Sequence, residues 1–122
     1  MSIPILKHGA TLIVSLQAEP TDAEFVELQT DLTRRVTETH AKGVIIDVTA
    51  LDVLDSFATR TLREIAQTVT LCGARAAIVG VQPEVAFAMA QLGLSLEGTL
   101  TALDLEDGLA LLHATFPAAL VR

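Results

Sequence analysis

A continuous β-branched run, Val44-Ile-Ile-Asp-Val48, places the strongest constraint on the fold. Such a run is typical of a central strand that is covered on both faces. Ala74–Val79 is interpreted as another buried strand, and the segment between the two strands has helical periodicity. One stripe at this spacing contains Ala58, Leu62, Ile65, Val69 and Cys72. A strand, a crossover helix from Ser56 to about Cys72 and another strand predict a parallel pair packed against its helix.

The N-terminal third predicts a hairpin and a first helix. Two short β-rich segments, Ile3–Leu6 and Thr11–Gln17, flank His8-Gly9-Ala10, where glycine can supply a turn. Thr21 and Glu24 then have the spacing of a capping box, in which a hydroxyl and a carboxylate satisfy backbone donors at a helix start. This helix is expected to end near Lys42-Gly43.

The C-terminal third predicts two more helices with a short strand between them. Pro83-Glu84 favours a helix start and the helix is expected to run through Leu92, with Leu100–Leu103 as the last strand. Asp104 can cap a final helix through Phe116, although Gly108 weakens its first turn. The order β-β-α-β-α-β-α-β-α predicts an α/β fold with a mixed, mainly parallel sheet. No linker or repeat divides the 122 residues, so we expect one domain, 1–122, whose last few residues fray.

Composition argues against several classes of partner. The formal charge is −7 and aromatic residues make up 3% of the chain, which disfavours nucleic acid and an anionic membrane surface. No apolar stretch reaches the roughly 20 residues of a bilayer span, and Met1–Lys7 is too short for a signal peptide. We therefore expect a cytoplasmic protein. The lone Cys72 lies in an apolar helical run and is interpreted as buried core.

The sequence contains no recognisable catalytic, cofactor or metal motif. His8, His40 and His113 have no ligand-like spacing and are interpreted as surface residues. Phosphate-binding glycine loops and nucleophile elbows are missing. Six carboxylates fit no known metal loop: Asp47, Asp52, Asp55, Asp104, Glu106 and Asp107. The last three crowd a helix start, where the dipole favours them, and Met89 is interpreted as core.

The segment Asp47–Arg60 stands out because it places a hydroxyl at a helix start after a buried strand. If Ser56 lies at or next to the N-cap, its side chain is near unpaired N–H groups and the positive end of the helix dipole. Arg60, four residues on, is on the same helical face as a partner for a phosphate, whereas Asp52 and Asp55 would repel one. Serine is also a common N-cap without any regulatory role, so position alone does not establish a switch.

The stretch Ile45–Arg60 resembles the signature of STAS domains, the sulfate-transporter and anti-sigma-factor antagonist family. The likeness continues through Leu71–Ala86 and Leu92-Gly-Leu94, so it covers essentially the whole chain. Single-domain anti-sigma antagonists typically carry Asp-Ser-Ser-Gly, whereas this chain has Asp55-Ser-Phe-Ala-Thr-Arg60. That variant is similar to the RsbS-type branch, the small STAS component of the stressosome.

The resemblance implies a non-enzymatic scaffold in which Ser56 is phosphorylated and no cofactor is bound. Its implied partners are RsbR-type STAS sensor proteins, an RsbT-like serine kinase that is held until phosphorylation, an RsbX-like phosphatase and further copies of itself. Asp55, Thr59 and Arg60 are then expected to form the neighbouring partner-contact surface, with Thr59 left open as a second acceptor. Three alternatives remain: a soluble antagonist that binds an anti-sigma kinase one to one, a small hydrolase using Asp52 and Asp55, and nucleotide binding by the fold.

Overall fold

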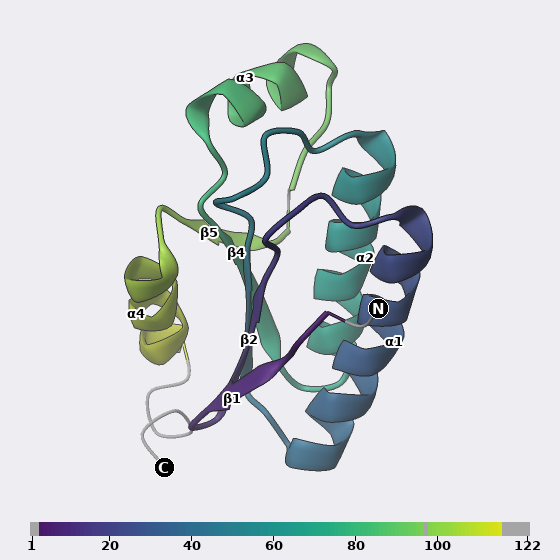
Figure 1. Cartoon of the computed structure of the whole chain (residues 1–122). Coiled ribbons are helices and arrows are strands. Elements are labelled where there is room, and N and C mark those ends of the chain that lie inside the picture. Colours follow the sequence, from purple (N-terminus) through teal and green to yellow (C-terminus); the bar gives the residue numbers. More distant parts are fainter. Residues whose placement is uncertain (1–2, 97, 116–122) are drawn as a thin grey trace.

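A mixed five-stranded sheet with helices on both faces organises the chain (Figure 1). The computed structural model describes residues 3–96 and 98–115. Its elements are β1 Leu6–His8, β2 Thr11–Ser15, α1 Asp22–Thr39, β3 Gly43–Asp47, α2 Ser56–Leu71, β4 Arg75–Val79, α3 Pro83–Gln91, β5 Leu100–Ala102 and α4 Leu105–Thr115. This order confirms the predicted alternation.

The strands lie in the order β1-β2-β3-β4-β5, with β1 antiparallel to β2 and the later neighbours parallel. Helices α1 and α2 cover one face, α4 covers the other, and α3 lies beyond the carboxyl ends of the strands (Figure 1). β3 is central, and its residues Val44, Ile45 and Ile46 are fully buried. Both faces of this strand are covered, as predicted, which explains why its residues are apolar on both sides.

The first strand differs from the prediction. The hairpin exists, but β1 is Leu6–His8 rather than Ile3–Leu6, and Leu6 pairs with Ile13. Pairing stays next to the turn at Gly9, whereas Pro4 has no N–H to offer a ladder. Ile3 and Ile5 still pack against the core from outside the ladder.

The predicted capping box at the start of α1 is confirmed. Thr21 Oγ1 accepts from Glu24 N at 3.1 Å, and Glu24 Oε1 accepts from Thr21 N at 2.9 Å. The helix ends at Thr39, before the predicted end near Lys42, because His40 turns into the left-handed region with φ 55°. Lys42 and Gly43 then bond to Ala10 O and lead into β3.

Cys72 is exposed, and the expectation that it is buried was wrong. The other members of its predicted stripe, Ala58, Leu62, Ile65 and Val69, are buried on one face of α2. The helix stops at Leu71, and the chain turns through Cys72 into Gly73, where φ is 95°. Helical spacing predicts the wrong environment for Cys72 because this residue is the C-cap and no longer lies on the buried face of the helix.

The last helix packs closely on the sheet. Asp104 Oδ1 accepts from Asp107 N at 2.8 Å, which confirms Asp104 as the cap of α4. Gly108 faces β4, where a Cβ would lie 2.6 Å from Val79 Cγ1. Gly108, which was expected to weaken the first turn of this helix, therefore permits α4 to approach β4 closely. Phe116 lies outside the described residues.

Candidate functional site

The β3–α2 connection lies at the carboxyl edge of the sheet and is anchored at both ends. Asp47 Oδ1 accepts from Thr49 N at 2.9 Å and from Thr49 Oγ1 at 2.6 Å. Further along, Leu51 and Leu54 are buried at 2% and 5% exposure. Two buried leucines in a short loop hold the intervening Asp52 and Val53 at the surface.

Asp55 is the N-cap of α2, and Ser56 is the first helical residue. Asp55 has extended backbone angles, and its Oδ1 accepts from Ala58 N at 2.7 Å. Sequence analysis allowed Ser56 either at the N-cap or beside it; the structure places it beside the cap. The Ser56 side chain is exposed.

The amides of Ser56 and Phe57 point out of the start of α2 with no acceptor inside the helix. The first intrahelical bond is donated by Thr59 N to Asp55 O at 2.9 Å, and Ala58 N is taken by the Asp55 carboxylate. A helix start with amides still available favours negative charge. Two carboxylates, Asp52 and Asp55, are exposed in the same segment and oppose such charge.

Arg60 and Thr59 have different environments, although both were predicted to be surface residues. Arg60 is exposed and lines a hollow with Arg63, Glu64, Gln67 and Gly98. Thr59 is 1% exposed, so its assignment to the contact surface was wrong. It lies between the buried stripe and Arg63, on the flank of α2 that faces the segment before β5, where Arg63 Nη1 donates to Ser95 O at 3.2 Å.

The Thr59 hydroxyl is a feature that sequence reasoning missed. Its Oγ1 atom is buried and has no hydrogen-bond partner. A buried, unpaired hydroxyl is unusual in a folded protein because its desolvation is not compensated. Helical periodicity could have indicated burial, since Thr59 is next to Ala58 and three residues before Leu62. No local pattern could have shown the missing partner.

Helix α3 is tied to the same connection. Gln82, the residue before α3, donates from Nε2 to Thr49 O at 2.6 Å. Gly80 packs directly against Thr49, and a Cβ at this position would overlap Thr49 Oγ1. The start of α3 and the loop before Ser56 therefore form one connected surface at the carboxyl edge of the sheet.

The other candidate residues do not come together into a second site. His8, His40 and His113 are exposed, as predicted, and Met89 is buried core. Within residues 3–96 and 98–115, no three His, Cys, Asp or Glu side chains are grouped closely enough to hold a metal ion. In the same ranges, no helix has the length and apolar character needed to cross a membrane.

Comparison with known proteins decides the family, because the STAS domain model matches residues 2–107. This chain belongs to the STAS domain family. The solved STAS structures that it resembles include a Ser-to-Glu variant of Moorella thermoacetica RsbS, with 35% identity and a TM-score of 0.80 over 93% of this chain and 96% of that one.

Two further relatives are a chain of the stressosome and an RsbT co-antagonist. A chain in the structure of the stressosome, described as a signal integration and transduction hub, has 36% identity and a TM-score of 0.76, covering 92% of this chain and 97% of that one. The RsbT co-antagonist protein RsbRA of Bacillus subtilis (strain 168) is 27% identical over 110 residues, or 89% of this chain. The STAS chain spans 40% of the length of RsbRA.

Proposed function

We propose that this STAS chain is a non-enzymatic scaffold of a stressosome-type assembly, and that phosphorylation of Ser56 controls its hold on an RsbT-like serine kinase. The observation that carries the proposal is the exposed Ser56 hydroxyl at the first position of α2, directly after the Asp55 cap. A kinase can reach this hydroxyl without unfolding the helix.

The relatives support this role. RsbS and the stressosome chain match almost the full length of this chain at 35% and 36% identity. The RsbS structure carries a Ser-to-Glu change, which replaces a neutral hydroxyl with a negative side chain. RsbRA is by name a co-antagonist of RsbT. Holding an RsbT-like kinase is consistent with all three.

Charge explains how the switch would work. Phosphorylation adds about −1.5 to −2 charges to a surface that already exposes Asp52 and Asp55. The free amides of Ser56 and Phe57 and the exposed Arg60 accommodate that charge locally. A partner fitted to the neutral hydroxyl would instead meet repulsion and lost shape complementarity, so it is released while α2 stays folded.

The remaining parts of the proposal concern assembly and location. We infer that residues 1–122 act as one domain in the cytoplasm, without a cofactor, and associate with further copies and with RsbR-type STAS sensor proteins. An RsbX-like phosphatase would restore the neutral Ser56. The chemistry of phosphate transfer then belongs to the kinase and the phosphatase, and Asp55 acts as a cap and not as a catalyst.

The test is a reconstitution with an RsbT-like kinase and ATP, followed by mass spectrometry of the Ser56 segment. We expect one dominant phosphate on Ser56, which Ser56→Ala abolishes. Kinase retention is compared between Ser56→Asp and Ser56→Asn, two variants of similar size that differ in charge. The aspartate variant should bind at least about tenfold more weakly, a loss of about 1.4 kcal/mol, while the asparagine variant keeps most of the affinity.

Equal kinase binding by Ser56→Asp and the unchanged chain would contradict the switch. One-to-one capture of an anti-sigma kinase, with no co-assembly with an RsbR-type protein, would favour the alternative antagonist role. Turnover of a substrate that is lost in Asp55→Asn would contradict the non-enzymatic scaffold.

A further inference from the structure

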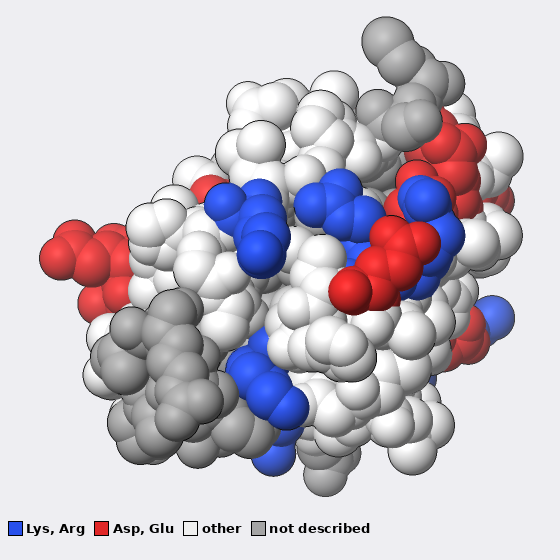
Figure 2. All heavy atoms as spheres, turned by 90° about the horizontal axis from the view of Figure 1, so that it is seen from below, with Lys and Arg blue, Asp and Glu red and all other residues white. Residues whose placement is uncertain are grey.

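Basic side chains gather at the end of the molecule opposite Ser56. Of the eight Lys and Arg residues, five lie at or near the amino ends of the parallel strands, a surface that we call the basic end: Lys7, Arg34, Arg35, Lys42 and Arg75. Figure 2 views this end from below and shows Lys and Arg side chains spread across it. Arg75 N bonds to Lys42 O at 3.0 Å, so the two central cations come from adjacent strand starts.

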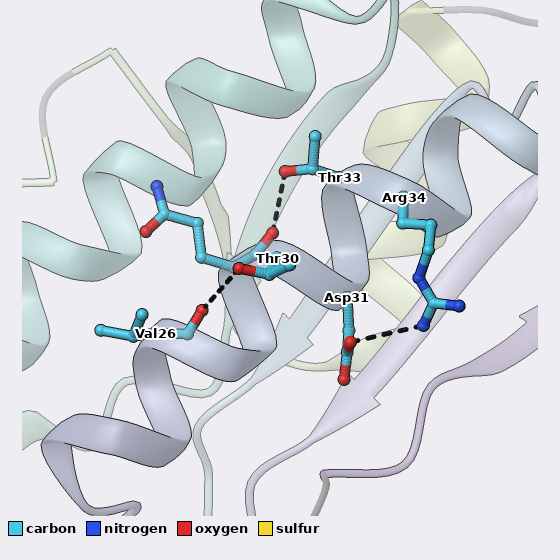
Figure 3. Close-up of polar contacts among 6 residues, drawn as sticks. Val26, Thr30, Asp31, Thr33 and Arg34 are labelled. Atoms are coloured by element: carbon cyan, nitrogen blue, oxygen red, sulfur yellow. Dashed lines mark hydrogen bonds and ion pairs between the residues drawn. The ribbon is translucent and has the colours of Figure 1, made fainter.

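Most of this charge is not neutralised within the described part of the chain. Arg34 pairs with Asp31 at 3.3 Å (Figure 3), but the other four cations make no ion pair with residues 3–96 or 98–115. Glu38 is the other acidic residue on this part of α1. Helices α1 and α2 both end here, yet neither has a basic residue in its last turn. Compensation of helix dipoles therefore does not account for the cations.

Exposed apolar side chains accompany the basic end. Leu71, at the end of α2, is 89% exposed, and Leu6, on the edge strand β1, is 64% exposed. Cations around exposed leucines suit a protein partner with carboxylates around an apolar contact. A nucleic acid would instead be matched by aromatic stacking platforms, and the chain has no Trp or Tyr.

The chain carries a complementary surface at the β5–α4 junction. Leu103 is 83% exposed and is followed by three exposed carboxylates; these four residues, Leu103, Asp104, Glu106 and Asp107, form what we call the acidic corner. Asp104 is engaged in capping, whereas Glu106 and Asp107 have no ion pair among the described residues. The acidic corner spans the loop before α4 and the first turn of that helix, on the face of the sheet opposite α2 (Figure 1).

We propose that the basic end of one copy packs against the acidic corner of a second copy. The contact is head-to-tail, so each copy uses a different surface for each neighbour and several copies can join. Ser56 lies on neither surface and stays open to a kinase. This inference rests on the proposed scaffold function for its choice of a second copy as the partner.

Each copy has a net charge of −7, so two copies repel each other, and the salt concentration determines how strongly. At about 0.15 M salt the Debye length is about 8 Å, so repulsion between distant charges is largely screened while opposite charges in contact still attract. At about 1 M salt the Debye length falls to about 3 Å, and the contact should weaken.

The experiment is sedimentation velocity of the full chain over a concentration series at about 0.15 M salt. We compare Lys42→Glu/Arg75→Glu with Arg60→Glu/Arg63→Glu, which makes the same change in net charge at the Ser56 end. The unchanged chain and the control should show concentration-dependent association, and the basic-end variant should associate at least tenfold more weakly.

A charge swap identifies the second surface. Glu106→Lys/Asp107→Lys should also fail to associate, and mixing it with Lys42→Glu/Arg75→Glu should restore association, because each contact then joins opposite charges. If reversal unfolds α4, judged by thermal melting, Glu106→Gln/Asp107→Asn replaces it and should weaken association without rescue.

Equal association of all variants, or a monomer at every concentration, would overturn the inference. So would an oligonucleotide or an unrelated acidic peptide that binds the basic end more tightly than a second copy does. Kinase capture and Ser56 phosphorylation are measured on the same variants. If the unchanged chain captures the kinase and is phosphorylated but does not self-associate, the inference fails alone; if the unchanged chain neither captures the kinase nor is phosphorylated, the switch proposal fails.

Discussion

The Asp55 carboxylate accepts a 2.7 Å hydrogen bond from Ala58 N, and this bond sets the conformation around Ser56. The cap uses the side chain of Asp55, so the Ser56 hydroxyl is not needed to start the helix. Ser56 is free to be modified because its neighbour performs the structural role that serine often has at a helix start. Capping and the proposed switching are therefore separable by mutation.

Asp55→Ala should destabilise the protein by about 1 kcal/mol, because Ala58 N loses its acceptor. Asp55→Asn should keep most of the stability, since asparagine also caps helices well. Urea denaturation measures both. If the alanine and asparagine variants are equally stable, the cap seen in the structure does not contribute to folding.

The asparagine variant also removes a carboxylate next to Ser56, the proposed phosphoacceptor. A phosphate on Ser56 should then meet less repulsion, so we expect phosphorylation at an equal or higher rate than in the unchanged chain. A kinase assay on the two proteins decides this. A rate that falls strongly in Asp55→Asn would show that the kinase itself needs the Asp55 charge.

Thr59→Val should stabilise the protein by about 1 kcal/mol, because it removes a buried hydroxyl that has no partner while keeping the branched shape. The matched control is Thr70→Val on the same helix, where the hydroxyl donates to Ala66 O at 2.7 Å. There the substitution should be neutral or destabilising. Chemical denaturation compares the pair, and a loss of stability in Thr59→Val would show that the hydroxyl has a partner in solution.

Gly108→Ala should destabilise α4 against the sheet. The added methyl group would lie 2.6 Å from Val79 Cγ1, and such overpacking costs about 1–3 kcal/mol, more than the roughly 1 kcal/mol that alanine gains in a helix. Combining Gly108→Ala with Val79→Ala should recover part of the lost stability, which a double-mutant cycle measures.

The control for helix propensity is Ala110→Gly on the exposed face of α4, which should cost about 1 kcal/mol. Additive effects of Gly108→Ala and Val79→Ala would contradict the contact.

The capping box should contribute a pH-dependent part of the stability. The hydrogen bond from the Thr21 backbone N–H, and then the bond with its hydroxyl, lowers the pKa of Glu24 below its usual value of 4.5. Because the folded-state pKa is the lower one, the contribution is complete above pH 4.5 and is lost as the pH falls through the folded-state value. Glu24→Gln should remove this dependence.

Denaturation of the unchanged chain and of Glu24→Gln is compared at neutral pH and below pH 4.5. The stability difference should be larger at neutral pH and shrink in acid. Glu27→Gln makes the same charge change on α1 away from the cap. A difference that stays constant with pH, or an equal effect in Glu27→Gln, would contradict a special role of Glu24.

The sequence by itself determined the alternation of strands and helices, the buried central strand and the caps at Thr21 and Asp104. These features depend on local chemistry: side-chain period, branching at Cβ and hydrogen bonds within three residues. For the same reason it indicated that Ser56 lies at a helix start. The resemblance to STAS domains, carried by residues around that position, added the expectation of a switch.

Only the tertiary structure decided the environments of Thr59, Cys72 and Gly108. Thr59 is 1% exposed, and Arg63, one turn further along the same flank of α2, bonds Ser95 O from a segment more than thirty residues away. Cys72 is exposed because the helix ends one residue earlier, and Gly108 is needed because α4 approaches Val79. Packing between distant segments, like the gathering of five cations at one end, leaves no trace in local spacing.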